Sequence, residues 1–252
     1  MTQTIDLNAD MGESFGQWVM GNDAALLDIV TSANVACGFH AGDPDVMATT
    51  MALAQDKGVG IGAHPGFPDL QGFGRHRRDI PHPTLANMVR YQVGAAQAMA
   101  RAQGCEVRHI KLHGALANMT TEDEAMARAA YEAALSVDPG IVLMVIAQTA
   151  QQRAAEALGV PFAAEIFADR AYNDDATLVD RRQPGAMVRD PDAAAKRMVA
   201  MVREGAIITA SGKRIPGQID TICCHGDTRE AVEIAGAVRR ALEADGIELA
   251  RL

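Results

Sequence analysis

Residues 59–75 read Val-Gly-Ile-Gly-Ala-His-Pro-Gly-Phe-Pro-Asp-Leu-Gln-Gly-Phe-Gly-Arg. The apolar beginning predicts a buried strand over Val59–Ala63, and the remainder predicts a loop. Glycines let the backbone of such a loop approach a ligand closely, and prolines make it stiff. A plain connection does not need a histidine, two phenylalanines and an arginine, whereas loops held by a rigid scaffold often carry binding and catalytic groups. A buried strand followed by a loop with polar side chains is the unit from which the fold is predicted.

Similar units recur along the chain, with amphipathic helical stretches between them. Further strands are predicted at Thr4–Asn8, Ser32–Cys37, Val107–Leu112, Ile141–Ala147, Phe162–Phe167 and Thr221–Cys224. Their largely apolar interiors are typical of a parallel sheet that is covered on both faces. Capping residues and prolines predict helix starts at Asp43-Pro44, Pro83, Thr121, Asp190-Pro191 and Asp227, and helix ends at Gly58, Gly104 and Gly246. A hairpin tip is predicted at Ser211–Arg214.

An open doubly wound sheet and a closed barrel both fit this alternation. Clusters rich in polar residues, however, recur at the end of nearly every predicted strand. Their members are Asn8, Asp10, Phe39, His40, His64, Lys111, His113, Glu165, Asp169, Arg170, His225 and Asp227. In a (β/α) barrel all strand ends converge on one face, whereas in an open sheet only a subset meets. We therefore predict an α/β fold, a (β/α) barrel of about seven parallel strands that resembles a TIM barrel, with residues 1–252 forming one domain.

Bulk properties exclude several classes of protein. The 252 residues carry a formal net charge of -9, which argues against nucleic acid or an anionic membrane as the main partner. No signal peptide and no membrane-spanning apolar run is found. The four cysteines include no CxxC pair, a usage that favours reduced thiols and predicts a cytoplasmic protein. Phosphate-loop, GxGxxG and GxSxG motifs are also missing from the sequence.

Histidine and lysine are the candidate chemical groups at the strand ends. His40, His64, His113 and His225 fall there, and histidine suits both proton transfer and metal ligation near neutral pH. Because strand side chains alternate, Lys111 shares a face with His113. A lysine that points into a barrel needs a counter-charge or an anionic ligand. The structural alternative is an ion pair with Glu165 or Asp10.

Asn8 with Asp10, Arg170 and His109 are the remaining residues whose side chains can be placed from the sequence. Asn8 and Asp10 share a strand face, so both side chains are expected at the barrel mouth, although Asn and Asp are also common in plain turns. Arg170 follows Asp169 directly and is expected either to bind substrate or to pair with that aspartate. His109 is expected at the outer start of its strand in a structural role.

Taken in order, seven segments of the chain resemble the LamB/YcsF family: Asp6–Gly16, Asn34–Asp43, Gly62–Arg75, Lys111–Asn118, Glu165–Tyr172, Gln183–Ala186 and His225–Asp227. The resemblance implies a barrel similar to the glycoside hydrolase/deacetylase superfamily. It also implies ATP-dependent opening of the lactam 5-oxoproline to glutamate, together with the 5-oxoprolinase subunits B and C. The chain departs from the family's usual residues at Leu112, Ala117, Asp175 and Asp180.

Hydrolysis of a lactam needs a polarised carbonyl and an activated water. We expect catalysis from Asp10, His40, His64, Lys111, His113 and Glu165, and substrate binding by Asn8, Glu13, Phe39, Arg75, Arg170 and His225. Lys111 and the histidines would stabilise an anionic intermediate, while Asp10 or a histidine would act as base. Since the chain has no phosphate loop of its own, ATP is expected to act through the partner subunits.

Two alternatives remain open at this point. A metal-dependent deacylase or deacetylase of a small amide or carbohydrate would hold a divalent cation with Asp10, His40 and His64. A non-catalytic subunit would only present a small acid to its partners. The sequence also leaves open whether the chain forms a homo-oligomer.

Overall fold

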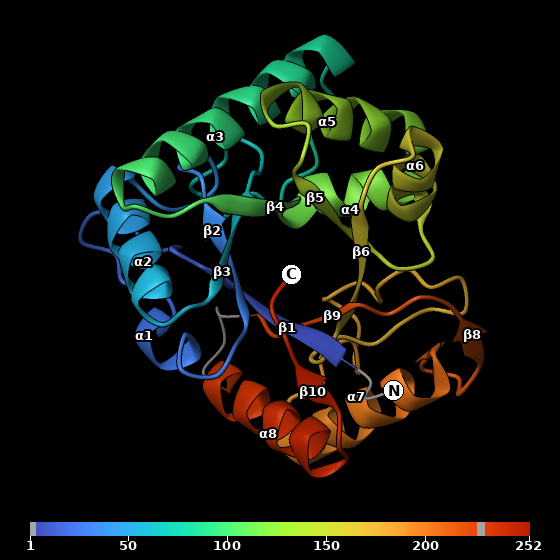
Figure 1. Ribbon diagram of the computed structural model, residues 1–252. Coiled ribbons are helices and arrows are strands. Elements are labelled where there is room, and N and C mark those ends of the chain that lie inside the picture. The colour runs from blue at the N-terminus through green and yellow to red at the C-terminus, as the bar shows by residue number, and fades with distance from the viewer. Residues whose placement is uncertain (1–3, 226–229) are drawn as a thin grey trace.

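The computed structural model describes residues 4–225 and 230–252, and in it seven parallel strands close into a barrel (Figure 1). Around the ring these strands are β1 (Thr4–Met11), β2 (Ser32–Ala36), β3 (Gly60–His64), β4 (Val107–Lys111), β5 (Val142–Ile146), β6 (Phe162–Phe167) and β9 (Thr221–Cys223). Strand β9 pairs with both β6 and β1, which closes the sheet. The predicted (β/α) barrel and its strand number are confirmed.

Helices surround the barrel and cover its outer face (Figure 1). They are α1 (Asp23–Leu26), α2 (Pro44–Asp56), α3 (His82–Ala102), α4 (Gly114–Glu122), α5 (Glu124–Val137), α6 (Ala150–Leu158), α7 (Pro191–Glu204) and α8 (Ala231–Ala244). Two small additions stand outside the ring. Strand β10 (Glu248–Leu249) pairs with the start of β1, and an antiparallel hairpin of β7 (Ala206–Ile208) and β8 (Arg214–Pro216) carries the predicted tip.

Local capping chemistry explains most helix starts. The carboxylate of Asp43 accepts hydrogen bonds from the backbone N–H groups of Asp45 and Val46 at the start of α2, and Asp190 caps α7 in the same way. The predicted start at Thr121 is wrong, because Thr121 lies inside α4 and Asp123 caps α5 instead. An extended backbone at Asp123 separates these two helices. The predicted start at Asp227 lies outside the described residues.

Several strands have a polar inner face and an apolar outer face, whereas Met144 and Ile146 of β5 line the cavity with apolar side chains. In β1, Leu7, Ala9 and Met11 belong to the hydrophobic core, whereas Asn8 and Asp10 bond to side chains of other strands across the barrel interior. This differs from the expected continuous apolar strands, since only the outward side chains pack against helices. No helix in the described part of the chain is long and apolar enough to cross a membrane.

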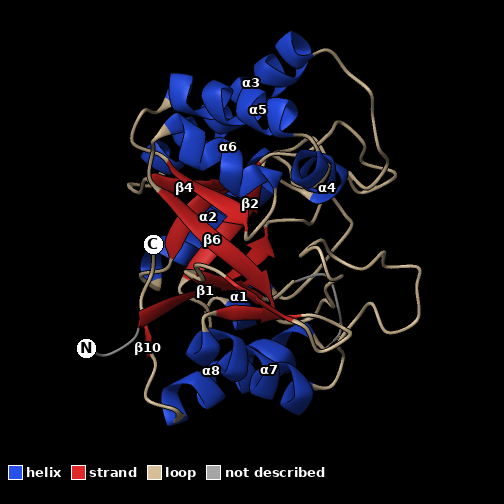
Figure 2. Cartoon of the chain, turned by 90° about the vertical axis from the view of Figure 1, so that its right-hand side faces the viewer, coloured by secondary structure: helices blue, strands red, loops and turns tan. Residues whose placement is uncertain are grey.

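The two ends of the barrel are unlike each other. The start of β1 and the C-terminus lie at one end, and the long loops gather at the other, where the parallel strands finish (Figure 2). The loops after β3 and β6 are among them. This is the end at which (β/α) barrels build their sites.

Candidate active site

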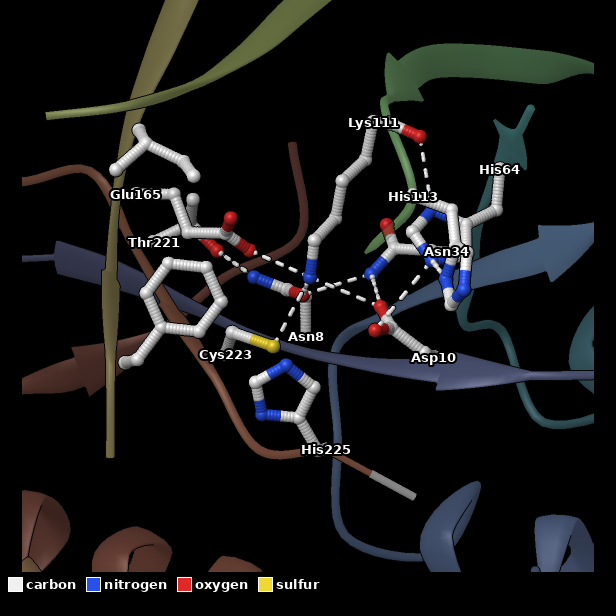
Figure 3. A network of polar contacts seen from close by, with 12 residues as sticks. Asn8, Asp10, Asn34, His64, Lys111, His113, Glu165, Thr221, Cys223 and His225 are labelled. Carbon is white, nitrogen blue, oxygen red and sulfur yellow. Dashed lines mark hydrogen bonds and ion pairs between the residues drawn. The ribbon is translucent and has the colours of Figure 1, made fainter. Parts of the chain in front are cut away.

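A buried lysine occupies the centre of the barrel mouth (Figure 3). Lys111 on β4 places its Nζ 2.9 Å from Asp10 Oδ1 of β1 and 2.8 Å from Glu165 Oε1 of β6. The same Nζ lies 2.9 Å from Cys223 Sγ and 3.3 Å from Asn8 Oδ1. The lysine thus joins side chains from β1, β6 and β9 across the barrel, and both ion pairs that the sequence offered as alternatives are present.

The two carboxyl groups around Lys111 have opposite pKa shifts. Burial raises the pKa of Asp10, but His64 and Lys111 more than offset this and hold it well below the ordinary value. Burial also raises the pKa of Glu165, and there Lys111 offsets the effect only in part. Burial lowers the pKa of Lys111, yet Asp10 and its other neighbours hold it well above the usual range. Lys111 therefore lies between two unlike acids: Asp10, whose pKa is lowered, and Glu165, whose pKa is raised.

Three histidines and Glu13 form a second cluster beside the lysine. His64 Nε2 lies 3.0 Å from His113 Nδ1 and 3.4 Å from Asp10 Oδ2. The His40 ring stacks on the His113 ring with centroids 3.6 Å apart, and His40 Nε2 lies 3.5 Å from Glu13 Oε1. Burial lowers the pKa of both His40 and His113 well below the ordinary histidine value.

The glycine-rich loop makes room for these rings. A Cβ on Gly74 would lie 2.7 Å from His40 Cβ and 2.8 Å from His113 Cδ2, both closer than atoms pack. Gly74 also has a positive φ of 64°, which glycine adopts at no steric cost. The loop backbone at Gly74 therefore does approach other groups closely, as predicted, and these groups are the side chains of His40 and His113.

A layer of amides supports the site from below. Asn34 on β2 donates from Nδ2 to Asn8 Oδ1 at 2.8 Å and to Asp10 Oδ1 at 2.9 Å. Its own Oδ1 lies 2.7 Å from His109 Nε2. The expectation that His109 lies at the outer start of its strand is wrong, because the ring is fully buried inside the barrel. Burial, with repulsion from Lys111, lowers the pKa of His109 to about 3, so the ring is neutral.

His225 is held at the mouth by an acid. Its Nδ1 lies 2.8 Å from Asp169 Oδ1, and its ring stacks on Phe167. Asp169 therefore pairs with this histidine rather than with the arginine beside it in the chain. Arg170 instead donates from Nη2 to the carbonyl of Val179 at 2.7 Å.

These groups open onto a cavity of about 1060 Å³. Asp10, Glu13, His64, Lys111, His113, Glu165 and His225 line its floor and walls. Its arginines are Arg75, Arg77, Arg170, Arg181 and Arg182. The four positions at which the chain departs from the usual family residues, Leu112, Ala117, Asp175 and Asp180, line it as well.

Most of the predicted site residues line this cavity, and three do not. Asn8 lies beneath the cavity in the amide layer, and His40 lies behind His113. Phe39 stacks on Tyr91 of α3 with centroids 5.5 Å apart and does not line the cavity.

Sequence reasoning missed the residues that support the site. Asn34, His109, Thr221 and Cys223 belong to its network but were not proposed. For His109 the signal was present, because it alternates with Lys111 and His113 on one strand face. For Cys223, a small apolar residue in an apolar run, nothing in the sequence indicated contact with a lysine.

A sequence model of the LamB/YcsF family matches residues 5–252. The A subunit of 5-oxoprolinase from Ruegeria pomeroyi is 64% identical over 245 residues, covering 97% of this chain and 97% of that protein. The crystal structure of a lactam utilization protein from Thermus thermophilus has a TM-score of 0.93 at 40% identity, covering 99% of this chain and 100% of that one.

A more distant structure resembles the chain in fold alone. The catalytic domain of a peptidoglycan N-acetylglucosamine deacetylase from Eubacterium rectale has a TM-score of 0.53 at 12% identity, covering 100% of this chain and 89% of that one. The match of the family model over nearly the whole length, with the 64% identical relative, settles the assignment. The chain belongs to the LamB/YcsF family.

Proposed function

We propose that this chain is the A subunit of an ATP-dependent 5-oxoprolinase and that it opens the lactam of 5-oxoproline to glutamate. The observation that carries the proposal is the buried Lys111 between Asp10 and Glu165 at the floor of the cavity. The names of the two relatives, one a 5-oxoprolinase component and the other a lactam utilization protein, support the substrate class.

The part of the cavity around Arg170 is suited to the anionic group of a substrate. Although the chain has a net charge of -9, Arg75, Arg170 and Arg181 line the cavity together. Burial and the repulsion of Arg181 lower the pKa of Arg170 to about 10. Nε of Arg170 is buried without a hydrogen-bond partner among the described residues. A carboxylate or phosphate beside this guanidinium would provide that partner and relieve the repulsion.

The unequal carboxyl groups suit proton transfer. Ring opening requires a water oxygen to attack the carbonyl carbon, a base to take the water proton, and an acid to protonate the ring nitrogen as the C–N bond breaks. Glu165, whose pKa burial raises, is better suited to take up and release a proton than Asp10, whose pKa His64 and Lys111 hold low and which keeps Lys111 charged. Lys111 then stabilises the negative charge of the phosphorylated tetrahedral intermediate.

ATP enters this scheme through partner proteins. The chain has no phosphate-loop motif, so subunits B and C are proposed to transfer a phosphoryl group from ATP to the lactam oxygen, with release of ADP. Water addition and cleavage of the C–N bond then give a glutamyl phosphate, and a second water hydrolyses it to glutamate and inorganic phosphate. The cavity of about 1060 Å³ is large for a nine-atom lactam and leaves room for a phosphorylated one.

The deciding experiment is an assay of glutamate release from 5-oxoproline and ATP, with and without subunits B and C. Turnover is expected only with all components present. 5-Oxoproline-dependent ATP hydrolysis by the chain alone would refute the division of labour between subunits.

Two further measurements separate the alternatives. A metal-dependent deacylase would hydrolyse acetylated amides or sugars without ATP. A chain that only presents the lactam to its partners would bind 5-oxoproline and would keep full turnover in Asp10→Asn, whereas the proposed mechanism requires a loss of roughly two or more orders of magnitude.

A further inference from the structure

The orientation of two histidines poses a chemical problem. His64 Nδ1 lies 2.8 Å from the carbonyl oxygen of Lys111, and His113 Nε2 lies 2.9 Å from the carbonyl oxygen of Phe73. A carbonyl oxygen only accepts hydrogen bonds, so each of these ring nitrogens must carry the proton. The opposite nitrogens, His64 Nε2 and His113 Nδ1, then present lone pairs to each other at 3.0 Å. Two lone pairs at this distance repel unless a positive species lies between or beside them.

Two more potential ligand atoms lie close to this pair. His40 is 1% exposed, and neither of its ring nitrogens has a hydrogen-bond partner among the described residues. Its Nε2 lies 3.5 Å from Glu13 Oε1, which is in turn 3.9 Å from His113 Nδ1. One atom from each of Glu13, His40, His64 and His113 falls within 4.8 Å of the others. A bridging proton would satisfy only the pair formed by His64 and His113.

The separations match those of ligands around a small cation. Bonds of about 2.0–2.1 Å from zinc to nitrogen or oxygen place two tetrahedral ligand atoms about 3.3 Å apart. The separations here are 3.0, 3.5 and 3.9 Å. Because the His40 and His113 rings stack nearly parallel with centroids 3.6 Å apart, one of these two rings has to turn about its Cβ–Cγ bond to direct its nitrogen at a shared cation. Calcium and magnesium prefer sets made only of oxygen atoms, whereas imidazole favours zinc and its neighbours in the first transition row.

We propose that Glu13, His40, His64 and His113 bind a divalent cation of the zinc type. The two backbone carbonyls hold His64 and His113 in the required tautomers, as outer hydrogen-bond partners of metal ligands commonly do. This set differs from the expected set of Asp10, His40 and His64. Asp10 bonds to Lys111 and Asn34 through Oδ1, and its Oδ2 lies 3.4 Å from His64 Nε2 as a neighbour of the site.

The cation would lie where the proposed reaction takes place. Glu13, His64 and His113 line the cavity next to Lys111, so a bound cation would be within reach of a substrate oxygen and could polarise it. Only this catalytic role rests on the proposed function. The binding site itself rests on the geometry of the four side chains.

The test is metal binding by the full chain, without substrate, ATP or partner subunits. Protein stripped with a chelator and then dialysed against Zn²⁺ is expected to retain one equivalent, and Co²⁺ is expected to give visible absorption typical of nitrogen and oxygen ligands. Added Zn²⁺ should also raise the melting temperature. These three measurements on the unaltered chain need no variant to fold.

Variants then identify the ligands. His40→Asn and Glu13→Gln should each weaken Zn²⁺ binding by on the order of 100-fold or more. The matched control is His82→Asn, because His82 is exposed at the start of α3, and it should bind Zn²⁺ like the unaltered chain. Asp10→Asn should retain most of the affinity.

Three results would overturn the proposal. The first is retention of less than about a tenth of an equivalent of Zn²⁺ at saturation. The second is unchanged Zn²⁺ binding in both His40→Asn and Glu13→Gln. The third is Zn²⁺ binding that is lost in Asp10→Asn and kept in Glu13→Gln. Nitrogen-15 NMR of the chain dialysed against Zn²⁺ that still shows a proton shared by His64 and His113 would also overturn it, because the proton would then be the positive species. A chain that binds Zn²⁺ but releases no glutamate with its partners would refute only the proposed function.

Discussion

Replacing Lys111 by methionine tests whether the centre of the site is a balanced charge network. The Nζ atom lies 2.9 Å from Asp10 and 2.8 Å from Glu165. At an effective dielectric constant of about 20, each of these contacts corresponds to about 6 kcal/mol of Coulomb attraction. Desolvation of the three buried groups cancels part of this attraction. Removing the lysine alone leaves two buried carboxyl groups uncompensated, so we expect Lys111→Met to lower the free energy of unfolding by about 3–5 kcal/mol at pH 7.5.

The loss should depend on pH with a definite sign. Without the cation, burial raises the folded-state pKa of both carboxyl groups above their values in the unfolded chain. The folded variant then binds more protons than the unfolded one between those values, so its stability falls as the pH rises through that window. The deficit relative to the unaltered chain is therefore largest at neutral pH and shrinks as the pH falls through the folded-state pKa values.

Urea unfolding at several pH values, followed by circular dichroism, measures this deficit through the shift in midpoint. The control is the triple variant Lys111→Met, Asp10→Asn, Glu165→Gln, which removes all three charges together and should recover most of the stability. Turnover with partner subunits should fall at least 100-fold in both variants. A single variant as stable as the unaltered chain at pH 7.5, or a deficit independent of pH, would refute the network argument. Near-normal turnover would refute the role of Lys111 in the reaction.

Three further outcomes are expected. Gly62→Ala should lower the free energy of unfolding by about 1–3 kcal/mol, because its Cβ would lie 2.1 Å from His109 Nε2. The control is Gly94→Ala in α3, where no atom lies within 4 Å of the added Cβ, and thermal melts should show it to be neutral or stabilising. Arg170→Met should raise the KM for the lactam with a smaller change in kcat if this arginine holds the substrate anion, and a changed kcat with unaltered KM would contradict that role. Asp169→Asn should be destabilising at neutral pH: burial raises the pKa of Asp169, but its histidine partner offsets this and holds it below the ordinary value. Its stabilising contribution is therefore lost as the pH falls through that lowered pKa, and urea midpoints measured from pH 7 down to pH 2 should converge with those of the unaltered chain.

The sequence alone determined the architecture and the end of the barrel that carries the site. Apolar runs such as Val59–Ala63 and Ser32–Cys37, each followed by polar residues, are local patterns. Closing parallel strands into a ring necessarily brings their ends together. Lys111, His113 and Glu165 could therefore be assigned to one mouth before any contact was known.

Only the tertiary structure decided which partners these residues have. His109 is buried in the amide layer and Asp169 pairs with His225, since both contacts join strands or loops far apart in the chain. The same holds for Glu13, which the structure groups with three histidines in place of Asp10. Side-chain alternation limits which face of a strand a residue occupies, but the stagger of neighbouring strands sets the height at which side chains meet across the barrel. That height depends on the pairing of the whole ring, so no local segment of the sequence specifies it.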